Sequence, residues 1–428
     1  MIKKYGNQLI VRRLRRRVVR LLNDHGLTII MVTGTIGKTS TKLAIGELLE
    51  KAGRKVCYSA DSYNTEIGIP LALFGLKAPE RVVNPVEWVK ILREMDAQLE
   101  EYPYDTIVIE ISEDDRELMF PWVKLMSPQI AVLTGVSPAH MNRFESVDEL
   151  LDDSIALASQ SDEIYYHADF AAVQEKMGRK KGARGYGLDR GVVRFENLKR
   201  RRDGLITADL VLGRHREEIK TQMVATQSLG SLLAAASVAQ SLGVDRGVIV
   251  RGLGMIAPVK GRMRLLPAVN GARLIDDTYN SSPMAVVAAL DTLKELKADR
   301  HIAVLGSMNE LGDHSADLHA QIGISAAEHD LDLLVTVGRE AAAYIIPAAI
   351  EAGMDKAKIK QFRTPYEAGY FLKKMLKETD LVLTKGSQNG VFTEETSRIL
   401  LSPALKPAEE LVRQSRGWKA RKKKSFGL

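Results

Sequence analysis

Cysteine and long apolar runs are both scarce in this sequence. The chain of 428 residues has a single cysteine, Cys57, which excludes an intrachain disulfide framework and a zinc site built from thiolates. No stretch approaches the roughly 18 consecutive apolar residues of a membrane-spanning helix. Arginines fill the first 30 residues, where a signal peptide would carry its apolar core. These absences predict a cytoplasmic protein.

Acidic residues are absent from both ends of the chain. Residues 1–20 hold eight basic residues and residues 413–428 hold seven, with no acid in either stretch. The chain has 61 basic and 54 acidic residues, so the remainder carries a net charge of −8. An acidic body does not suit a protein that grips nucleic acid over its main surface, and we expect no nucleic-acid partner.

Short β-branched runs alternate with helical patterns, which is typical of parallel α/β sheets. The runs lie at residues 28–32, 106–111, 130–134, 163–166, 302–306, 333–337 and 381–384. Residues 178–222 interrupt the rhythm and predict an antiparallel excursion or covering hairpin. A short link bracketed by Pro258 and Gly261 separates two complete α/β patterns. We therefore divide the chain into an N-terminal helix (1–27), a central domain (28–258), a C-terminal domain (259–405) and a basic tail (406–428).

A glycine-rich segment lies between the first predicted strand and its helix, Thr33-Gly34-Thr35-Ile36-Gly37-Lys38-Thr39-Ser40-Thr41. Glycines allow successive backbone N–H groups to face an anion, and the helix N-terminus adds positive potential. Lys38 is placed to reach terminal phosphates and the Thr39 hydroxyl to bind Mg²⁺. Val32 stands where the general motif has its first glycine, so the strict motif fails by one position. We predict a P-loop-type domain in which Gly34, Thr35, Gly37, Lys38, Thr39 and Ser40 bind a nucleotide.

This variant of the loop resembles that of the Mur ligase family, and further motifs follow in the family's order. Residues 63–71 resemble its asparagine-rich segment, Glu110 its magnesium-binding glutamate, and residues 137–140 its metal-site histidine motif. Gly261-Arg262 and residues 276–283 resemble the start of its C-terminal domain. Residues 304–312, His319 and residues 385–387 are similar to the branch that joins D-alanyl-D-alanine to a peptidyl cell-wall precursor. The likeness spans residues 29–400.

The resemblance implies an ATP- and Mg²⁺-dependent ligase that forms an amide bond through an acyl phosphate. A carboxylate must be activated before an amine can attack it, because hydroxide is a poor leaving group, and phosphoryl transfer from ATP supplies that activation. The family likeness assigns catalysis to Lys38, Glu110 and His140, and the Mg²⁺ site to Thr39, Glu110 and His140. Taken alone, Glu110 and His140 are equally explained as strand-end residues that face solvent.

The resemblance also assigns contacts that lie mostly in the C-terminal domain. It implies that Arg262, Asp277 and Asn280 contact the nucleotide, and that the substrates contact Asn64, Glu310, His319, Lys385 and Ser387. The alternative is structural, because a carboxylate such as Asp277 can cap a turn and Asn280 can start a helix. Capping and packing likewise explain the residues assigned to the substrates.

Two departures from the family pattern concern single residues. The family's carbamylated lysine, which bridges a second metal, falls on Ser154, and a serine cannot carry that negative charge. Either Asp152 or Asp153 substitutes as an oxygen ligand, or the second Mg²⁺ is bound weakly. The asparagine expected before the alanine-rich helix falls on Ser231, and residues 225–228 replace the preceding Gly-x-His-Asn, so one contact on the adenine side is in doubt.

The largest departures lie at the two ends. Only 32 residues precede Thr33, where the family places a domain for the uridine end of the acceptor. Helical spacing of Val11, Leu14, Val18 and either Leu21 or Leu22 predicts a basic amphipathic helix there instead. Such a helix suits an anionic membrane surface, a protein partner or a uridine diphosphate group, or it docks on the chain itself. We predict that the tail around Trp418 is a disordered, solubilising end.

We therefore predict an α/β protein with a central P-loop-type parallel sheet domain followed by a smaller Rossmann-like C-terminal domain. The predicted function is ATP-dependent ligation, with small-molecule or peptidyl substrates and ATP and Mg²⁺ as cofactors. Two alternatives stay open: a Mur-like ligase for another carboxylate, and a degenerate nucleotide-binding scaffold that acts through its basic ends. Ser154 and Ser231 favour the scaffold, whereas four intact site residues favour an enzyme: Lys38, Thr39, Glu110 and His140.

Overall fold

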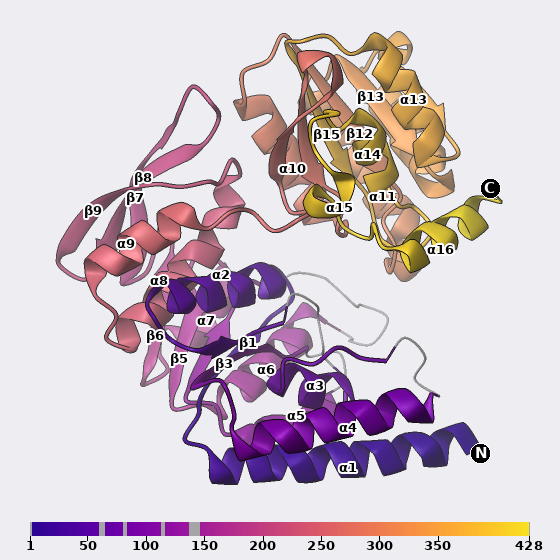
Figure 1. The fold of residues 1–428 in the computed structure, drawn as a ribbon. Helices are drawn as coiled ribbons and strands as arrows, with labels where there is room; N and C mark the ends of the chain where they lie inside the picture. Colours follow the sequence, from indigo (N-terminus) through magenta and orange to yellow (C-terminus); the bar gives the residue numbers. More distant parts are fainter. Residues whose placement is uncertain (1, 60–64, 80–83, 113–115, 137–145, 428) are drawn as a thin grey trace.

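The computed structural model describes residues 2–59, 65–79, 84–112, 116–136 and 146–427, and the strands in these ranges form two sheets (Figure 1). The first contains β1 (Thr28–Thr33), β2 (Val56–Cys57), β3 (Thr106–Glu110), β4 (Ile130–Leu133), β5 (Glu163–His167), β6 (Ala183–Gly187), β7 (Val193–Arg200), β8 (Ile206–Leu212) and β9 (His215–Lys220). The second contains β10 (Arg264–Pro267), β11 (Arg273–Asp277), β12 (Arg300–Gly306), β13 (Leu333–Val337), β14 (Ile359–Phe362) and β15 (Asp380–Lys385). Both sheets are mostly parallel, which confirms the predicted α/β class.

Helices cover both faces of each sheet. Those around the first sheet are α1 (Ile2–Asp24), α2 (Lys38–Lys51), α3 (Gly68–Leu73), α4 (Pro85–Glu100), α5 (Arg116–Met126), α6 (Val147–Ala158), α7 (Ala171–Met177), α8 (Leu229–Ser241) and α9 (Arg246–Met255). Those around the second are α10 (Pro283–Glu295), α11 (Ser315–Glu328), α12 (Ile346–Glu351), α13 (Pro365–Met375), α14 (Glu394–Leu400), α15 (Pro407–Glu410) and α16 (Arg416–Phe426). Among the described segments, no helix combines the length and the apolar character that crossing a lipid bilayer requires.

The first sheet has the strand order β2-β3-β1-β4-β5-β6-β7-β8-β9, and its central strands alternate between two cores. Ile29 and Met31 of β1 pack with α1, α4 and α5, whereas Ile30 and Val32 pack with α2, α8 and α9. A period of two, with both faces apolar, is what a parallel sheet buried between helix layers requires. The carboxyl ends of β1 and β3 are therefore held rigidly next to each other.

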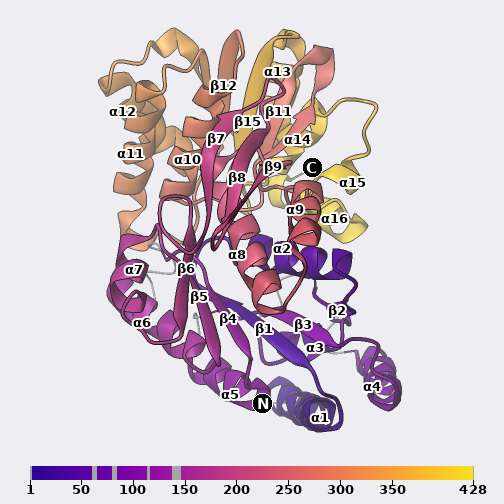
Figure 2. The same cartoon turned by 90° about the vertical axis from the view of Figure 1, so that its left-hand side faces the viewer.

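The strands after α7 depart from the parallel pattern, as the sequence predicts for residues 178–222. β6 still pairs parallel with β5, but β7, β8 and β9 form an antiparallel meander at the edge of the sheet. Figure 2 shows this meander rising towards the second sheet. Arg200, near its tip, forms an ion pair with Glu295 of α10, so the excursion contacts the C-terminal domain.

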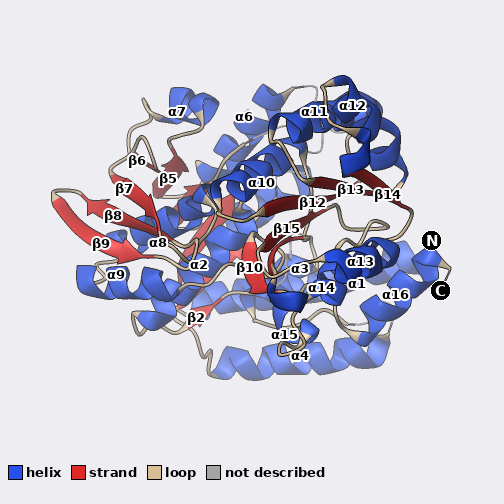
Figure 3. Cartoon of the chain, turned by 90° about the horizontal axis from the view of Figure 1, so that it is seen from above, coloured by secondary structure: helices blue, strands red, loops and turns tan. Residues whose placement is uncertain are grey.

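The second sheet has the strand order β10-β11-β15-β12-β13-β14, with only β10 antiparallel to its neighbour. α10, α11 and α12 cover one face and α13 and α14 cover the other (Figure 3). Because β15 lies between β11 and β12, the loops that follow Asp277, Gly306 and Lys385 emerge side by side. Open α/β sheets bind their ligands at this carboxyl edge.

The basic N-terminal helix docks on the chain's own core. α1 packs along α4, and Leu14, Val18 and Leu21 are fully buried among the residues of the first core. The exposed face carries Arg12, Arg13, Arg16 and Arg20, whereas the half-buried Arg17 forms an ion pair of 2.6 Å with Asp96 of α4. Of the roles that the sequence left open, the structure shows docking, with the charged face towards solvent.

The expectation of a disordered C-terminal tail is wrong. Residues 407–427 contain α15 and α16, and α16 packs against α14 and the loop before it. The reason is that one lysine of the basic run, Lys422, is fully buried between the carboxylates of Glu394 and Glu395. The rings of Trp418 and Phe426 also contact Phe392, with centroids 6.3 and 6.1 Å away.

Candidate active site

The predicted phosphate loop connects β1 to α2, and its two glycines have different roles. Gly34 has a φ of +114°, and a Cβ there would lie 2.4 Å from Thr134 Oγ1, so only glycine fits. Gly37 is the left-handed N-cap of α2, and among the described residues no atom lies within 4 Å of the place that a Cβ would take. The left-handed conformation favours glycine at this position and starts α2 here, and the N-terminus of a helix is the end at which an anion is stabilised.

We expected successive backbone N–H groups of the loop to face an anion, but two of them donate to another part of the chain. The N–H groups of Thr35 and Ile36 both donate to the Gly135 carbonyl, at 3.0 Å each. The Lys38 ammonium donates back to the Gly34 carbonyl across the loop. The donors available to a phosphate thus begin at the N-terminus of α2, while Thr35 fastens the loop to the end of β4.

A buried ion pair lies beside this loop. Glu110 ends β3 directly opposite Val32 of β1, and its Oε2 is 3.1 Å from Lys42 Nζ. Each of these two side chains is only 3 % exposed, which makes the pairing necessary because an unpaired buried charge is costly. Lys42 was not among the residues predicted from the sequence. Its position, one turn after Lys38 on the same helix, is the feature that could have identified it.

The described residues fit a Mg²⁺ ion whose remaining ligands are phosphate oxygens. Thr39, 8 % exposed, offers a hydroxyl and Glu110 a carboxylate, and both are hard oxygen ligands. No group of three or more His, Cys, Asp or Glu side chains gathers within the described ranges. This is compatible with Mg²⁺, which usually binds through one or two carboxylates together with substrate phosphates and water. His140 and Asn64 lie outside the described residues.

In the C-terminal domain, Asp277 and Lys385 form a second buried ion pair. They end the neighbouring strands β11 and β15, and Lys385 Nζ lies 2.6 Å from Asp277 Oδ2. The same ammonium donates to the Asn280 carbonyl at 3.1 Å, and Asp277 Oδ1 accepts from the Met263 N–H at 3.2 Å. The pair therefore fixes the loop after β11, including Asn280, to the strand that follows the interdomain link.

Arg262 lies at the end of that link and is stacked on an aromatic ring. Its guanidinium carbon is 4.2 Å from the centroid of the Tyr279 ring, a cation–π contact. Tyr279 itself is tied to the link because its N–H donates to the Gly261 carbonyl at 3.0 Å. The structure thus brings together Arg262, Asp277 and Asn280, the three residues that were assigned to the nucleotide in this domain.

The loops after β12 and β15 are joined through Ser387. This fully buried side chain accepts from the Asn309 N–H at 2.9 Å and donates to the Ser281 carbonyl at 3.3 Å. Glu310 follows Asn309, is exposed and has a φ of +66°. The carboxylate of Glu310 is therefore presented at the rim of the same sheet edge that holds Asn280.

His319 differs from the expectation of substrate contact. Its side chain is fully buried on α11, where Nε2 accepts from the Met308 N–H at 2.9 Å and Nδ1 donates to the Ser315 carbonyl at 2.7 Å. Both ring nitrogens are used within the chain, which corresponds to the neutral ring. His319 therefore supports the loop that carries Glu310 from beneath.

The two single-residue departures have structural explanations. Ser154 is fully buried in α6 and donates to the Leu150 carbonyl at 3.0 Å, so it serves helix packing. Asp152 is exposed and forms an ion pair of 2.7 Å with Lys176 of α7. Ser231 donates to the Ser228 carbonyl, and the adjacent Gln227 donates to the Ala288 carbonyl of α10. Residues 225–228 therefore contact the C-terminal domain.

Comparison with known proteins identifies the family. Residues 32–239 match the model of the Mur ligase middle domain, and residues 261–388 match that of the Mur ligase glutamate ligase domain. The chain therefore belongs to the Mur ligase family, and the expectation that it is a ligase is confirmed. The family models stop at residue 388, so they do not include α14, α15 or α16.

Several proteins that resemble this chain share one enzyme name. The UDP-N-acetylmuramoyl-tripeptide–D-alanyl-D-alanine ligase of Synechocystis is 27% identical over 390 residues, which are 87% of this chain and 75% of that protein. Its counterpart in Mycobacterium leprae is 28% identical over 414 residues, which cover 88% of this chain and 74% of that protein. Both likenesses support the branch of the family that the motifs predicted.

Solved structures share the fold. The MurF ligase of Thermotoga maritima, crystallised with ADP, has a TM-score of 0.74 and 23% identity, and the match covers 91% of this chain and 83% of that one. A MurF structure from Acinetobacter baumannii has a TM-score of 0.72 with 22% identity, covering 90% and 78%. These matches agree with the two-sheet α/β architecture described above.

Proposed function

We propose that this chain is an ATP-dependent ligase that joins D-alanyl-D-alanine, or a similar amine, to a peptidyl carboxylate of a cell-wall precursor. The observation that carries the proposal is the glycine turn at Gly37 that starts α2 directly after β1, with Lys38 donating across the loop and Glu110 at the end of the adjacent strand. The names of the relatives supply the amine and the acceptor. The carboxyl edges of the two sheets are where an α/β fold of this kind binds its ligands.

The reaction takes place in two transfers. A carboxylate oxygen of the acceptor attacks the γ-phosphorus of ATP, and ADP leaves to give an acyl phosphate. The amine nitrogen then attacks the acyl carbon, phosphate leaves, and the proton of the amine passes to solvent. The role of Lys38 is to stabilise negative charge on the γ-phosphoryl oxygens during the first transfer and on the leaving phosphate during the second.

We assign Mg²⁺ to Thr39 and Glu110, with His140 as a further ligand. When bound, the ion neutralises charge on the phosphate oxygens. Lys42 Nζ, at 3.1 Å from Glu110 Oε2, balances the charge of this carboxylate in its buried position. In this assignment Arg262, Asp277 and Asn280 serve the nucleotide from the C-terminal domain, and Asn64 and Glu310 are the residues that we assign to the substrates. Lys385 and Ser387, which are buried and bonded within the chain, hold the loops on that side and do not themselves contact a substrate, contrary to the expectation from the sequence.

The domain limits and the setting of the enzyme belong to the same proposal. We place the central domain at residues 28–258 and the C-terminal domain at residues 259–405, with the tail docked on the latter. We propose a cytoplasmic enzyme with small-molecule or peptidyl substrates. The exposed arginines of α1 are the candidate face for an anionic surface or a protein partner, since the apolar face of this helix is already buried.

The test is ligation of a panel of peptidyl acceptors and amines, followed by phosphate release and mass spectrometry of the product. Lys38→Ala should lower turnover by about 10² to 10³-fold with an unchanged circular dichroism spectrum. The matched control is Lys51→Ala at the far end of the same helix, where the ammonium pairs with Glu47 at 3.3 Å and should not affect turnover. Ligation by Lys38→Ala at the native rate would refute the assignment. A native protein that binds ATP but ligates nothing would favour the scaffold alternative.

A further inference from the structure

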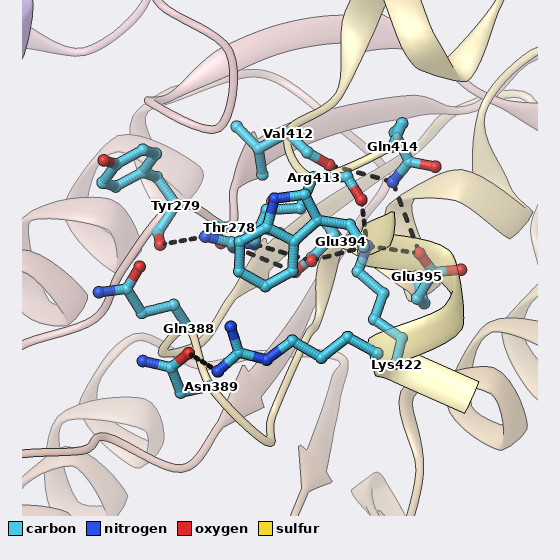
Figure 4. Close-up of polar contacts among 12 residues, drawn as sticks. Thr278, Tyr279, Gln388, Asn389, Glu394, Glu395, Val412, Arg413, Gln414 and Lys422 are labelled. Carbon is cyan, nitrogen blue, oxygen red and sulfur yellow. Dashed lines mark hydrogen bonds and ion pairs between the residues drawn. The ribbon is translucent and has the colours of Figure 1, made fainter. Parts of the chain in front are cut away.

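The C-terminal segment, residues 411–426, lies beyond the part of the chain that matches the family models, yet it reaches the candidate nucleotide loop (Figure 4). Lys422 Nζ lies 2.9 Å from Glu394 Oε1 and 2.7 Å from Glu395 Oε1, and it donates to the Arg413 carbonyl at 2.8 Å. Lys422 and Glu394 are fully buried. These contacts hold the backbone at Arg413 in one place.

Arg413 connects this buried cluster to the loop after β11. Its Nε donates to Glu394 Oε1 at 2.9 Å, its Nη1 donates to the Tyr279 carbonyl at 3.0 Å, and its Nη2 donates to the Thr278 carbonyl. The side chain is 7 % exposed. Arg413 also has a φ of +53°, a left-handed conformation that costs free energy outside glycine and persists where the surroundings enforce it.

The loop that Arg413 holds carries the ring on which Arg262 is stacked. The guanidinium carbon of Arg262 is 4.2 Å from the Tyr279 ring centroid, and that of Arg413 is 5.7 Å from the same centroid. Val412 lies close to the interdomain link as well, because a Cβ built on Gly261 would be 3.2 Å from Val412 Cγ1. The C-terminal segment, the link and the loop therefore form one packed unit around Tyr279.

We propose that Arg413 is a positioning residue for ligation. By fixing the Thr278 and Tyr279 carbonyls, it orients the Tyr279 ring, and the ring in turn orients Arg262 towards ATP bound on the central domain. This inference rests on the proposed function, because it assigns Arg262 to ATP. The C-terminal segment then links closure of the two domains to the correct position of a cationic side chain, and such positioning has a large effect on rate.

The primary test is Arg413→Lys. Lysine keeps a positive charge beside Glu394 but lacks the planar fork that bonds one carboxylate and two carbonyls at once. We expect kcat to fall about tenfold, while the dissociation constant of ATP stays within about twofold of the native value. The matched control is Arg416→Lys, an exposed arginine at the start of α16, which should leave both constants unchanged. An unchanged kcat in Arg413→Lys would overturn the proposal.

Coupling to Arg262 separates positioning from general destabilisation. In an Arg262→Ala background the Arg413→Lys change should cause no further loss of kcat, because the side chain through which it acts is gone. Fully additive losses would overturn the proposal. Should Arg413→Lys fail to fold, Tyr279→Leu gives the same test, since it removes the stacked ring and leaves the buried ion pairs intact.

A measurement without turnover distinguishes this inference from the proposed function. Small-angle scattering with a non-hydrolysable ATP analogue should show compaction of the native protein and little compaction of Arg413→Lys. If Arg413→Lys compacts as the native protein does, or if the native protein binds the analogue without compacting, the inference alone is overturned. If the native protein neither binds the analogue nor ligates any acceptor, the proposed function itself is wrong.

Discussion

The two ends of the chain are alike in composition but differ in how they are attached to the rest of the molecule. Each is a run of basic residues without an acid, and each forms a helix that packs on the nearest domain. α1 attaches through its apolar residues and turns most arginines outwards. α16 attaches partly through a lysine, Lys422, whose charge is completely buried. The same kind of sequence thus leads to two different ways of holding a terminus.

The difference arises from what the neighbouring elements offer. Opposite α1, the core around α4 is apolar, and burial of Leu14 and Val18 supplies most of the attachment. Opposite α16, α14 begins with two adjacent buried carboxylates, Glu394 and Glu395, which would be costly if they were left unpaired. Lys422 is the cation that makes their burial tolerable. A basic run is therefore solvated or buried according to partners that lie elsewhere in the sequence.

Among the changes that test this contrast, removal of a buried carboxylate should lower the free energy of unfolding the most. Glu394→Ala leaves Lys422 and Arg413 buried beside one carboxylate in place of two, so it should lower the free energy of unfolding by about 4 kcal/mol. Urea denaturation measures the change. Glu409→Ala is the control, because its pair with Lys406 is mostly exposed and should contribute less than about 1 kcal/mol. Equal effects of the two changes would contradict the contrast between the ends.

A truncation of the apolar face of α1 should come next in size. Leu14→Ala leaves a cavity in a packed core and should cost about 3 kcal/mol. Leu9→Ala on the same helix is the control, because Leu9 is 55% exposed, and its replacement should cost less than about 0.5 kcal/mol. Denaturation curves of the two variants give the comparison. A loss from Leu9→Ala as large as that from Leu14→Ala would mean that α1 does not depend on this face.

Acid should act in opposite directions on two buried carboxylates of the C-terminal domain, Glu395 and Asp276. Burial alone would raise the pKa of Glu395, but hydrogen bonds from Lys422 and Arg398 outweigh it and leave that pKa below its ordinary value. Its stabilising contribution is therefore present above about pH 4.5 and is lost as the pH falls further. Burial raises the pKa of Asp276 to about 6, so the folded state gains relative stability as the pH falls from about 6 towards 4.

Substitution can distinguish the contributions of these two carboxylates to the pH dependence of stability. Glu395→Gln should flatten the loss of stability at the acid end, whereas Asp276→Asn should remove the gain between about pH 6 and pH 4. Urea denaturation at a series of pH values gives both slopes. Leu14→Ala should shift the whole curve downwards without changing its shape, because apolar contacts do not titrate. Parallel curves for all three variants would contradict the pKa shifts.

The sequence predicts those features that depend on local pattern. The strand at residues 333–337 is found at those residues, and the phosphate loop lies between a strand and a helix as its glycines and lysine predict. Both depend on residues that are close along the chain. The apolar period of α1 correctly identifies its buried face, because Leu14 and Val18 are one turn apart on one helix.

Features that depend on remote partners could not be predicted in this way. Arg413 and Tyr279 are 134 residues apart, and no local pattern indicates that the guanidinium of one binds the carbonyl of the other. Lys422 is one of four consecutive basic residues and has no feature that distinguishes it before its two carboxylates are known. The pair of Lys42 with Glu110 was missed for the same reason: Glu110 was predicted as a site residue, but the position of Lys42 one turn after Lys38 does not by itself indicate a partner on β3.

The smallest effect is expected from the charges of α1 themselves. Arg12, Arg13 and Arg16 are exposed, and Arg12 and Arg16 are like charges four residues apart on one helix, an arrangement that is destabilising by a few tenths of a kcal/mol. Replacing all three by glutamine should therefore leave the free energy of unfolding within about 0.5 kcal/mol of the native value, or raise it slightly. Urea denaturation at low and high salt measures this, and the slight gain should vanish when salt screens the repulsion. A loss above about 1 kcal/mol would show that the arginines hold α1 in place. In that case both ends would be attached through charge, and apolar burial would no longer distinguish the first from the second.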